Sequence, residues 1–171
     1  MEKATVYYTD FRVHAGTNLQ EKLEKLIKAA GIGQIDMDGK FVAIKIHFGE
    51  PGNLAFLRPN WAKTVADVVK SQGGLPFLTD CNTLYPGRRK NALEHLGAAQ
   101  ENGFWPMTTG CQVIIADGLR GTDDIEVPVP NAEYCPTAKI GRAIMDADVV
   151  ISLNHFKGHE STGFGGALKN L

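Results

Sequence analysis

Residues 151–171, ISLNHFKGHESTGFGGALKNL, hold the densest group of side chains that could do chemistry. The stretch begins as an apolar strand, passes two histidines and several glycines, and enters a helix near Ala167. We interpret it as an anion-binding element, because N–H groups at a helix start attract anions and glycines let a ligand approach the backbone. Its candidate ligand-binding residues are Lys157, Gly163, Gly165, Gly166, Lys169 and Asn170. An ordinary strand-to-helix turn is the alternative, since the spacing matches neither a Walker loop nor a dinucleotide-binding fingerprint.

The histidines offer a second kind of chemistry. His47, His155 and His159, together with Asp80, are candidate catalytic residues, because imidazole and carboxylate groups move protons in enzymes. The same three histidines could bind a divalent metal ion. His155 and His159 are four residues apart, but Gly158 between them argues against the helical geometry of a zinc site. Structural histidines held by hydrogen bonds are the alternative.

Four predicted strands deliver polar side chains to one edge of a sheet. Each apolar strand is followed at once by a polar residue: His47 after 41–46, Asp80 after 76–79, Asp117 after 112–116, and Asn154-His155 after 148–153. In an open parallel sheet these ends share one edge, where ligands bind. Asp80 and Asp117 could instead cap the turns that follow them. The pattern therefore predicts a shared pocket at the carboxyl edge.

The elements that position these residues alternate between strand and helix. A first strand is predicted at Ala4–Tyr8. Four helices are predicted: 19–30, which follows the capping residue Asn18, then Pro59–Gly73, Arg88–Gly103 and Thr137–Ala147. This order indicates an α/β fold with three layers, a mainly parallel sheet and helices on both faces. A proline-containing stretch predicts a small β-ribbon near residues 123–130. We expect one domain over residues 1–171.

The composition excludes several classes of function. The 171 residues carry a formal net charge of −1, so no basic surface for nucleic acid is indicated, and 43% are hydrophobic. No segment approaches the length of a membrane helix, and the first residues show no signal-peptide h-region, so we expect a cytoplasmic protein. The spacing of the three cysteines fits neither a disulfide framework nor a metal site, and a nucleophilic Cys81 has little support.

Two further expectations concern Lys45 and the end of the chain. Lys45 lies within an apolar strand and could be a surface lysine near a sheet edge. Residues 167–171 resemble the first turn of a helix without a later turn, so we expect the chain to be an N-terminal fragment of a longer protein. Apolar surface exposed in such a fragment would favour a homo-oligomer.

Four stretches carry a resemblance to a known family: Lys45–Asn53, Phe77–Tyr85, Ile115–Leu119 and, above all, His155–Leu171. They resemble the prokaryotic family catalogued as domain of unknown function 362. The resemblance implies a longer protein, often with a ferredoxin-type module that holds two [4Fe–4S] clusters, and Cys81, Cys111 and Cys135 are not expected to bind them. The family is distantly similar to the N-terminal domain of the lactate-racemase group, which uses a nickel-pincer nucleotide.

Three functions follow as hypotheses. The first is the α/β domain of an iron–sulfur-associated oxidoreductase that binds an anionic substrate or cofactor, and possibly a divalent metal, at the carboxyl edge of the sheet. The second is an isomerase or racemase that uses a nucleotide-derived cofactor there. The third is a non-catalytic ligand-binding or electron-transfer adaptor, with an electron-transfer protein as partner. A purely structural role for the polar residues at the sheet edge is the remaining alternative.

Overall fold

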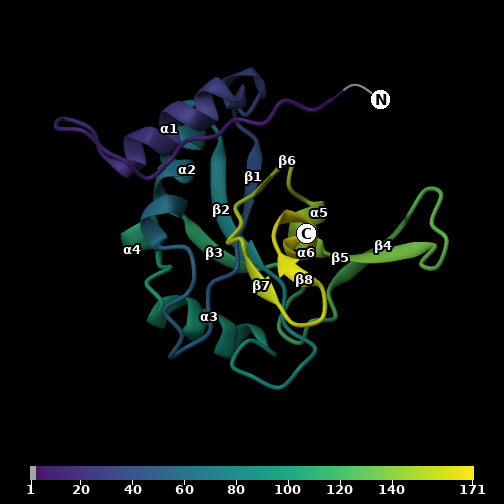
Figure 1. Ribbon diagram of the computed structural model, residues 1–171. Coiled ribbons are helices and arrows are strands. Elements are labelled where there is room, and N and C mark those ends of the chain that lie inside the picture. The colour runs from purple at the N-terminus through teal and green to yellow at the C-terminus, as the bar shows by residue number, and fades with distance from the viewer. Residues whose placement is uncertain (1–2) are drawn as a thin grey trace.

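The protein is built around a four-stranded parallel sheet with strand order β3-β2-β1-β6 (Figure 1). The computed structural model describes residues 3–171. Lys45 in β1 lies opposite Thr79 in β2 and Ser152 in β6, and Asp80 lies opposite Ile115 in β3. All three pairings are parallel, so the carboxyl ends of the strands meet at one edge, as the sequence predicts.

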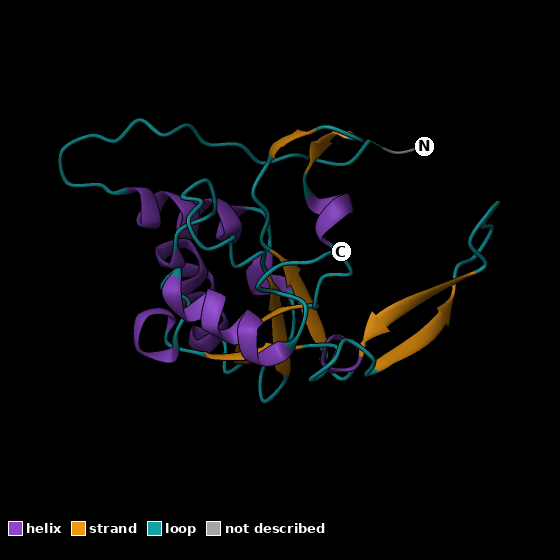
Figure 2. Ribbon diagram, turned by 90° about the horizontal axis from the view of Figure 1, so that it is seen from below, coloured by secondary structure: helices purple, strands orange, loops and turns teal. Residues whose placement is uncertain are grey.

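The chain alternates strands and helices through most of its length. The strands are β1 Phe41–Lys45, β2 Leu75–Asp80, β3 Gln112–Ile115, β4 Asp124–Pro128, β5 Thr137–Gly141, β6 Val149–Ser152, β7 Lys157–His159 and β8 Gly163–Gly165. The helices are α1 Leu19–Ala29, the 3-10 turn η1 Ile32–Gln34, α2 Pro59–Ser71, α3 Ala92–Glu101, α4 Pro106–Thr109, α5 Arg142–Met145 and α6 Ala167–Asn170. Helices α1 to α4 gather on one side of the sheet, and α5 and α6 lie on the other (Figures 1 and 2). This is the three-layer α/β arrangement expected from the sequence.

Local sequence explains where the main helices begin. Helix α1 begins after Asn18, whose side-chain oxygen accepts the Glu21 N–H at 2.9 Å, and α2 begins with Pro59. Helix α3 begins only at Ala92, because Asn91 caps it by accepting the Glu94 N–H at 3.0 Å. The predicted helix that starts at Arg88 is therefore four residues too long at its N-terminal end.

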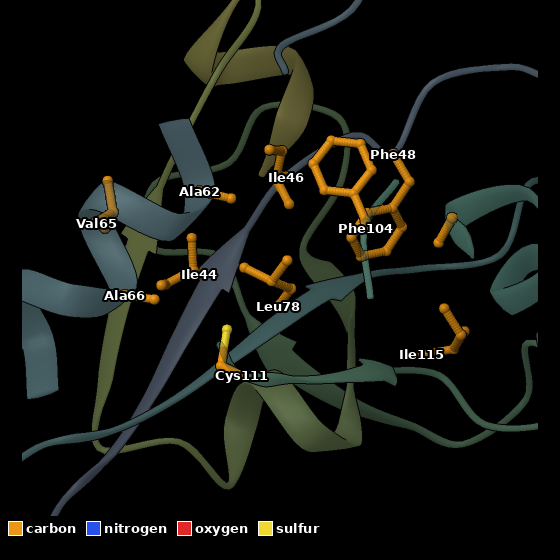
Figure 3. Packing of buried hydrophobic residues seen from close by; sticks show 11 residues of the cluster. Ile44, Ile46, Phe48, Ala62, Val65, Ala66, Leu78, Phe104, Cys111 and Ile115 are labelled. Carbon is orange, nitrogen blue, oxygen red and sulfur yellow. The ribbon is translucent and has the colours of Figure 1, made fainter. Parts of the chain in front are cut away.

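The core lies between the sheet and α2. Ile44 and Leu78 from the two central strands, with Ile46 just after β1, pack in one cluster with Ala62 and Ala66 of α2 (Figure 3). Phe48 and Phe104 extend this cluster, with ring centroids 5.3 Å apart. Burial of such apolar side chains stabilises the fold by about 25 cal/mol per Å² removed from water. The same packing fixes the direction in which β1 and β2 deliver the polar residues that follow them.

Two segments depart from the sequence-based expectations. The predicted strand Ala4–Tyr8 is wrong: the segment pairs with no strand, and Val6 is 86% exposed. The predicted helix Thr137–Ala147 is wrong in its first half, because Thr137–Gly141 pairs with β4 as an antiparallel strand. This pairing overrides local helix propensity and forms the ribbon that projects from the domain (Figure 2). The helix α5 begins only at Arg142.

The glycine-rich stretch also adopts a different structure from the one expected. Gly163 and Gly165 lie in β8, which pairs antiparallel with β7 as a hairpin, and α6 begins after the hairpin. The expected glycine turn is therefore wrong, because two of its glycines lie in a strand, whereas the helix expected to begin near Ala167 is confirmed. Alternating glycines can satisfy their backbone groups in a two-stranded ladder, and the partner strand is the preceding residues 157–159.

Candidate functional site

A cavity of about 510 Å³ lies at the carboxyl ends of β1 and β2. Its floor comes from these strands, and its walls come from the base of the β4–β5 ribbon, from α5 and from the closing segment of the chain. Five basic side chains line it: Lys45, Arg89, Lys139, Lys157 and Lys169. Two acidic side chains, Glu50 and Asp80, also line it. The cavity thus concentrates positive charge in a chain whose net charge is −1.

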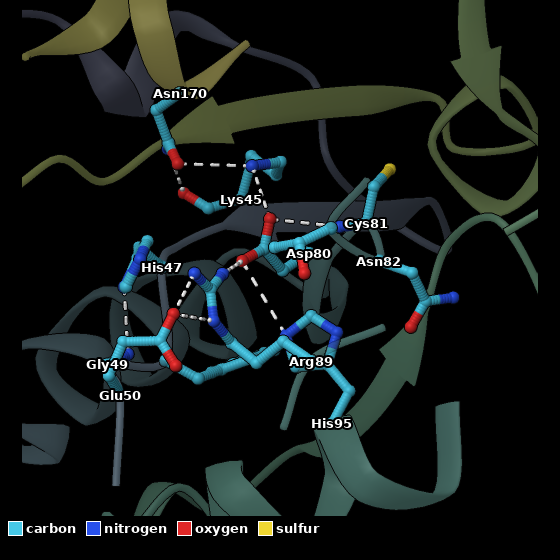
Figure 4. A network of polar contacts seen from close by, with 12 residues as sticks. Lys45, His47, Gly49, Glu50, Asp80, Cys81, Asn82, Arg89, His95 and Asn170 are labelled. Carbon is cyan, nitrogen blue, oxygen red and sulfur yellow. Dashed lines mark hydrogen bonds and ion pairs between the residues drawn. The ribbon is translucent and has the colours of Figure 1, made fainter. Parts of the chain in front are cut away.

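Lys45 is the central cation of the floor. Its side chain points toward Asn170 of α6, and the residue is only 7% exposed. The Nζ atom donates to Asp80 Oδ1 at 2.8 Å and to Asn170 Oδ1 at 3.1 Å, and Asn170 Nδ2 donates back to the Lys45 carbonyl oxygen at 3.3 Å (Figure 4). The expectation of a surface lysine is wrong, because β1 is a central strand. These bonds hold the end of the chain against the sheet.

Asp80 connects the buried charges at the end of β2. Its Oδ1 accepts the Cys81 N–H at 2.9 Å in addition to the Lys45 ammonium. Its Oδ2 lies 3.6 Å from Arg89 Nη1 and 3.7 Å from His95 Nε2. A buried carboxylate is costly unless cations and hydrogen bonds compensate it, and here both are present. Asp80 therefore organises the floor of the cavity.

Arg89 holds the loop after β1 against the loop after β2. Its Nε donates to Glu50 Oε1 at 2.7 Å, and its Nη2 contacts the same oxygen. Nη2 also donates to the Tyr85 hydroxyl at 2.6 Å. The arginine side chain is only 4% exposed, whereas that of Glu50 is 38% exposed. Both acidic groups of the cavity are thus already engaged by Lys45 and Arg89.

His47 lies beside this network as a neutral donor. Burial, and next the charge of Arg89, lower the pKa of His47 to about 4, so the ring is neutral at pH 7. Its Nδ1 accepts the Gly49 N–H at 2.9 Å, so we assign the ring hydrogen to Nε2. His47 lines both the main cavity and a smaller one of about 70 Å³ beside it. A neutral histidine with Nε2–H can donate a hydrogen bond to a bound anion.

His95 is a fully buried histidine behind the cavity. Neither ring nitrogen has a hydrogen-bond partner within the described residues, and the ring packs edge-on against Phe48 with centroids 5.7 Å apart. Burial lowers the pKa of His95 to about 4. The ring is therefore neutral at pH 7 and contributes packing beside Asp80.

The closing segment brings several of the predicted ligand-binding residues together. Lys157, Lys169 and Asn170 line both cavities. His155, Gly165 and Gly166 line the smaller one with His47. Gly163 and His159 line neither cavity.

His159 serves the turn of the hairpin. Its Nδ1 accepts the N–H groups of Ser161 and Thr162, both at 3.3 Å. Within residues 3–171, no group of three histidine, cysteine, aspartate or glutamate side chains is placed to share a metal ion. The predicted metal ligands His47 and His155 share the smaller cavity, and His159 lies outside it.

The remaining candidates at the sheet edge hold the loops in place. Asp117 accepts the Asn82 backbone N–H at 3.0 Å and Asn82 Nδ2 at 2.9 Å, which ties the loop after β2 to the loop after β3. Burial raises the pKa of Asp117, and burial followed by the charge of Asp117 raises the pKa of Cys81 to about 11. Cys81 is therefore a thiol rather than a thiolate near neutral pH.

The described cysteines do not fit an iron–sulfur cluster. Cys81 is half-buried, Cys111 is buried, Cys135 is exposed, and all three are free. No group of three metal-binding side chains occurs among residues 3–171, whereas a cluster of this type needs four cysteine thiolates.

Five residues of the site were not assigned to it from the sequence: Lys45, Glu50, Arg89, His95 and Lys139. Arg89 was assigned to a helix, and His95 lies on a helix that has no catalytic motif. Glu50 lies in the polar loop after β1, and this position at the end of a strand is the one feature of the sequence that could have assigned it to the site. Their proximity depends on how α3 and the loop before it pack against β2.

The fold and the site define a class of protein: a three-layer α/β domain with a basic cavity at the carboxyl edge of its parallel sheet. The chain belongs to the family described as domain of unknown function (DUF362), whose model matches residues 42–171. This match confirms the resemblance seen in the sequence. The ferredoxin-type module and the similarity to the lactate-racemase group stay predictions.

One curated protein is similar to this chain over most of the chain's length. The chain is 27% identical over 163 residues to a thylakoid-associated protein of Synechocystis sp., an alignment that covers 92% of this chain and 46% of that protein. The chain thus spans about half the length of the curated relative it matches. No solved structure matches the chain. In the part of the chain that the structure describes, the helices are all too short or too polar to cross a membrane.

Proposed function

We propose that this domain binds an anionic small molecule in the main cavity. The observation that supports the proposal is the charge balance of the lining, five basic side chains against two acidic ones. Both acidic groups are engaged by Lys45 and Arg89, so the remaining positive charge is available to a ligand. Clefts lined by one sign of charge attract ligands of the opposite sign.

We propose further that the domain serves a larger iron–sulfur-associated oxidoreductase as its ligand-binding part. The resemblance to relatives with a ferredoxin-type module supports this role. Any cluster would need ligands from outside residues 3–171, because the described cysteines lack the necessary arrangement. In this assignment the domain positions the anion, and a cytoplasmic electron-transfer partner or module supplies the electrons.

A racemase-like reaction is the second candidate, and the shared cavity of His47 and His155 favours it. His47 could not act as a base through Nδ1, which already accepts the Gly49 N–H. Nε2 carries the ring hydrogen, so it could accept a proton only if that hydrogen moved to Nδ1 and the bond from Gly49 broke; His155 is therefore the proton acceptor in this candidate. Mass spectrometry of the purified protein tests this candidate, since it requires a bound nucleotide-derived cofactor.

The test of anion binding is an NMR titration of the chain with inorganic phosphate, citrate and acetate. Amide signals in residues 45–50, 80–83 and 157–170 should shift with at least one anion, and glycerol should leave them unchanged. Lys45→Met should weaken the binding, and Lys25→Met on the exposed surface of α1 should not. If no anion shifts these signals, or if Lys25→Met acts like Lys45→Met, the proposed function is wrong.

A further inference from the structure

Lys157 and Lys169 are two cations of the cavity lining that have no ion-pair partner in the described part of the chain. A Cβ atom placed on Gly165 would lie 3.3 Å from Cδ of Lys169 and 3.9 Å from Cγ of Lys157, so both side-chain stems pass the same glycine. Both residues line the main and the smaller cavity. Neither forms an ion pair with any carboxylate of residues 3–171.

The other cations of the lining are already compensated. Lys45 and Arg89 are bonded to Asp80 and Glu50, and Lys139 lies 3.5 Å from Asp124 across the ribbon. The excess charge of the cavity is therefore located on the two lysines of the closing segment. Two ammonium groups that line the same cavity repel each other, and a ligand with two negative charges would offset this repulsion.

The third donor at this position is His47. It lines both cavities together with the two lysines. Because Nδ1 accepts the Gly49 N–H, the ring hydrogen lies on Nε2 and is available to a ligand. Two ammonium groups and one neutral N–H match the three oxygens of a phosphate monoester. A monocarboxylate would leave one ammonium uncompensated.

We infer that the ligand carries a dianionic phosphate monoester group, bound by Lys157, Lys169 and His47. This inference rests on the proposed function and names the class of anion. The rest of the ligand extends into the main cavity, where Ile140, Ile144 and Val150 supply an apolar wall. Pockets for small molecules commonly combine such a wall with a few polar anchors.

The test compares three probes that share a phenyl ring: phenyl phosphate, phenyl sulfate and benzoate. Phenyl sulfate has nearly the shape of phenyl phosphate with one charge less. At pH 8 and low salt, we expect calorimetry to show phenyl phosphate binding about tenfold more tightly than either monoanion, in line with charge-assisted hydrogen bonds to a second lysine. Lys157→Met and Lys169→Met should each weaken phenyl phosphate about threefold to tenfold and remove most of its advantage. Lys25→Met is the matched control with the same change in net charge.

The pH dependence provides a second readout. The second ionisation of a phosphate ester occurs near pH 6, so the advantage of phenyl phosphate should grow between pH 5 and pH 8. His47 stays neutral in this range, so the ratio of the two affinities reports the charge of the ligand.

The outcomes separate the two proposals. Equal affinities for all three probes, or an advantage that survives both lysine substitutions, would overturn the phosphate inference and leave anion binding standing. If none of the three probes binds and the titration with phosphate, citrate and acetate is also silent, the proposed function fails as well. Since Lys157 and Lys169 are exposed, their replacement should leave the fold intact, and circular dichroism checks this.

Discussion

Replacement of Asp80 by asparagine should destabilise the protein more than any exposed ion-pair substitution. The side chains of Lys45 and Asp80 are 9% and 8% exposed, and their charged atoms are 2.8 Å apart. The asparagine side chain would keep an acceptor for the Cys81 N–H but leave the buried ammonium without a counter-charge. Removing one partner of a buried pair costs about 3–5 kcal/mol. We expect a loss near the lower value, about 3 kcal/mol, because Arg89 keeps Glu50 as a partner.

The measurement is urea unfolding of four proteins: the parent, Asp80→Asn, Lys45→Met and the double variant. Lys45→Met should cost about 1–2 kcal/mol, since Asp80 retains Arg89 at 3.6 Å and the Cys81 N–H. The double variant should be more stable than the sum of the single losses predicts, by about 1–2 kcal/mol, because no unpaired ammonium remains. For a chain of this length, 3 kcal/mol corresponds to a fall in Tm of about 6–12 °C.

A matched control is available on α2. The Lys63–Asp67 pair has an N–O distance of 2.6 Å, but its side chains are 50% and 51% exposed. Asp67→Asn should cost no more than about 0.5 kcal/mol, because water and salt screen an exposed pair. If Asp80→Asn costs no more than Asp67→Asn, or if the two cavity substitutions are simply additive, burial does not control this network and the reasoning is refuted.

Three further predictions concern pH, packing and thiol reactivity. Burial lowers the pKa of His95 from 6.5 to about 4, so the unfolded state binds more protons than the folded state between these two pH values. The free energy of unfolding should therefore fall as the pH drops from about 6.5 to 4. In urea unfolding, His95→Leu should reduce the slope of this pH dependence, and an unchanged slope would contradict the assignment. Gly141→Ala should destabilise by about 1–3 kcal/mol, because its Cβ would lie 2.9 Å from the Ala116 backbone and 3.0 Å from Cys81 Sγ. Gly158→Ala, where a Cβ meets nothing within 4 Å, should change the free energy of unfolding by less than about 0.5 kcal/mol, and equal losses would argue against the packing at Gly141. Iodoacetamide at pH 8 should label the exposed Cys135 first and Cys81 slowly, because the pKa of Cys81 is raised to about 11. Peptide mass spectrometry measures both rates, and labelling of Cys81 faster than Cys135 would contradict this prediction.

The positions of the polar residues at the strand ends could be predicted because a parallel sheet fixes them. Each apolar run in β1, β2, β3 and β6 ends at the same edge, so His47 and Asp80 meet there by topology alone. Lys157, Lys169 and Asn170 were also placed at the ligand site from the sequence, and they line the cavity. The roles of these residues in catalysis or ligand binding stay predictions.

Partners that are distant in sequence could not be predicted. Lys45 and Asn170 are 125 positions apart, and nothing near Lys45 indicates that an amide from the end of the chain will accept a hydrogen bond from its ammonium group. Arg89 reaches Glu50 across 39 positions. The helical pattern of residues 137–147 was misleading for the same reason, because β4 supplies hydrogen bonds that compete with a local helix.

The sequence by itself determined the α/β class, the edge of the sheet where polar groups gather and the family to which the chain belongs, since hydrophobic periodicity and short motifs are local properties. Tertiary structure alone decided that Lys45 is buried, that His95 stands behind Asp80 and that two lysines have no ion-pair partner among residues 3–171. Those outcomes depend on how far each group is removed from water and which charges surround it, and both quantities arise only when distant segments pack together.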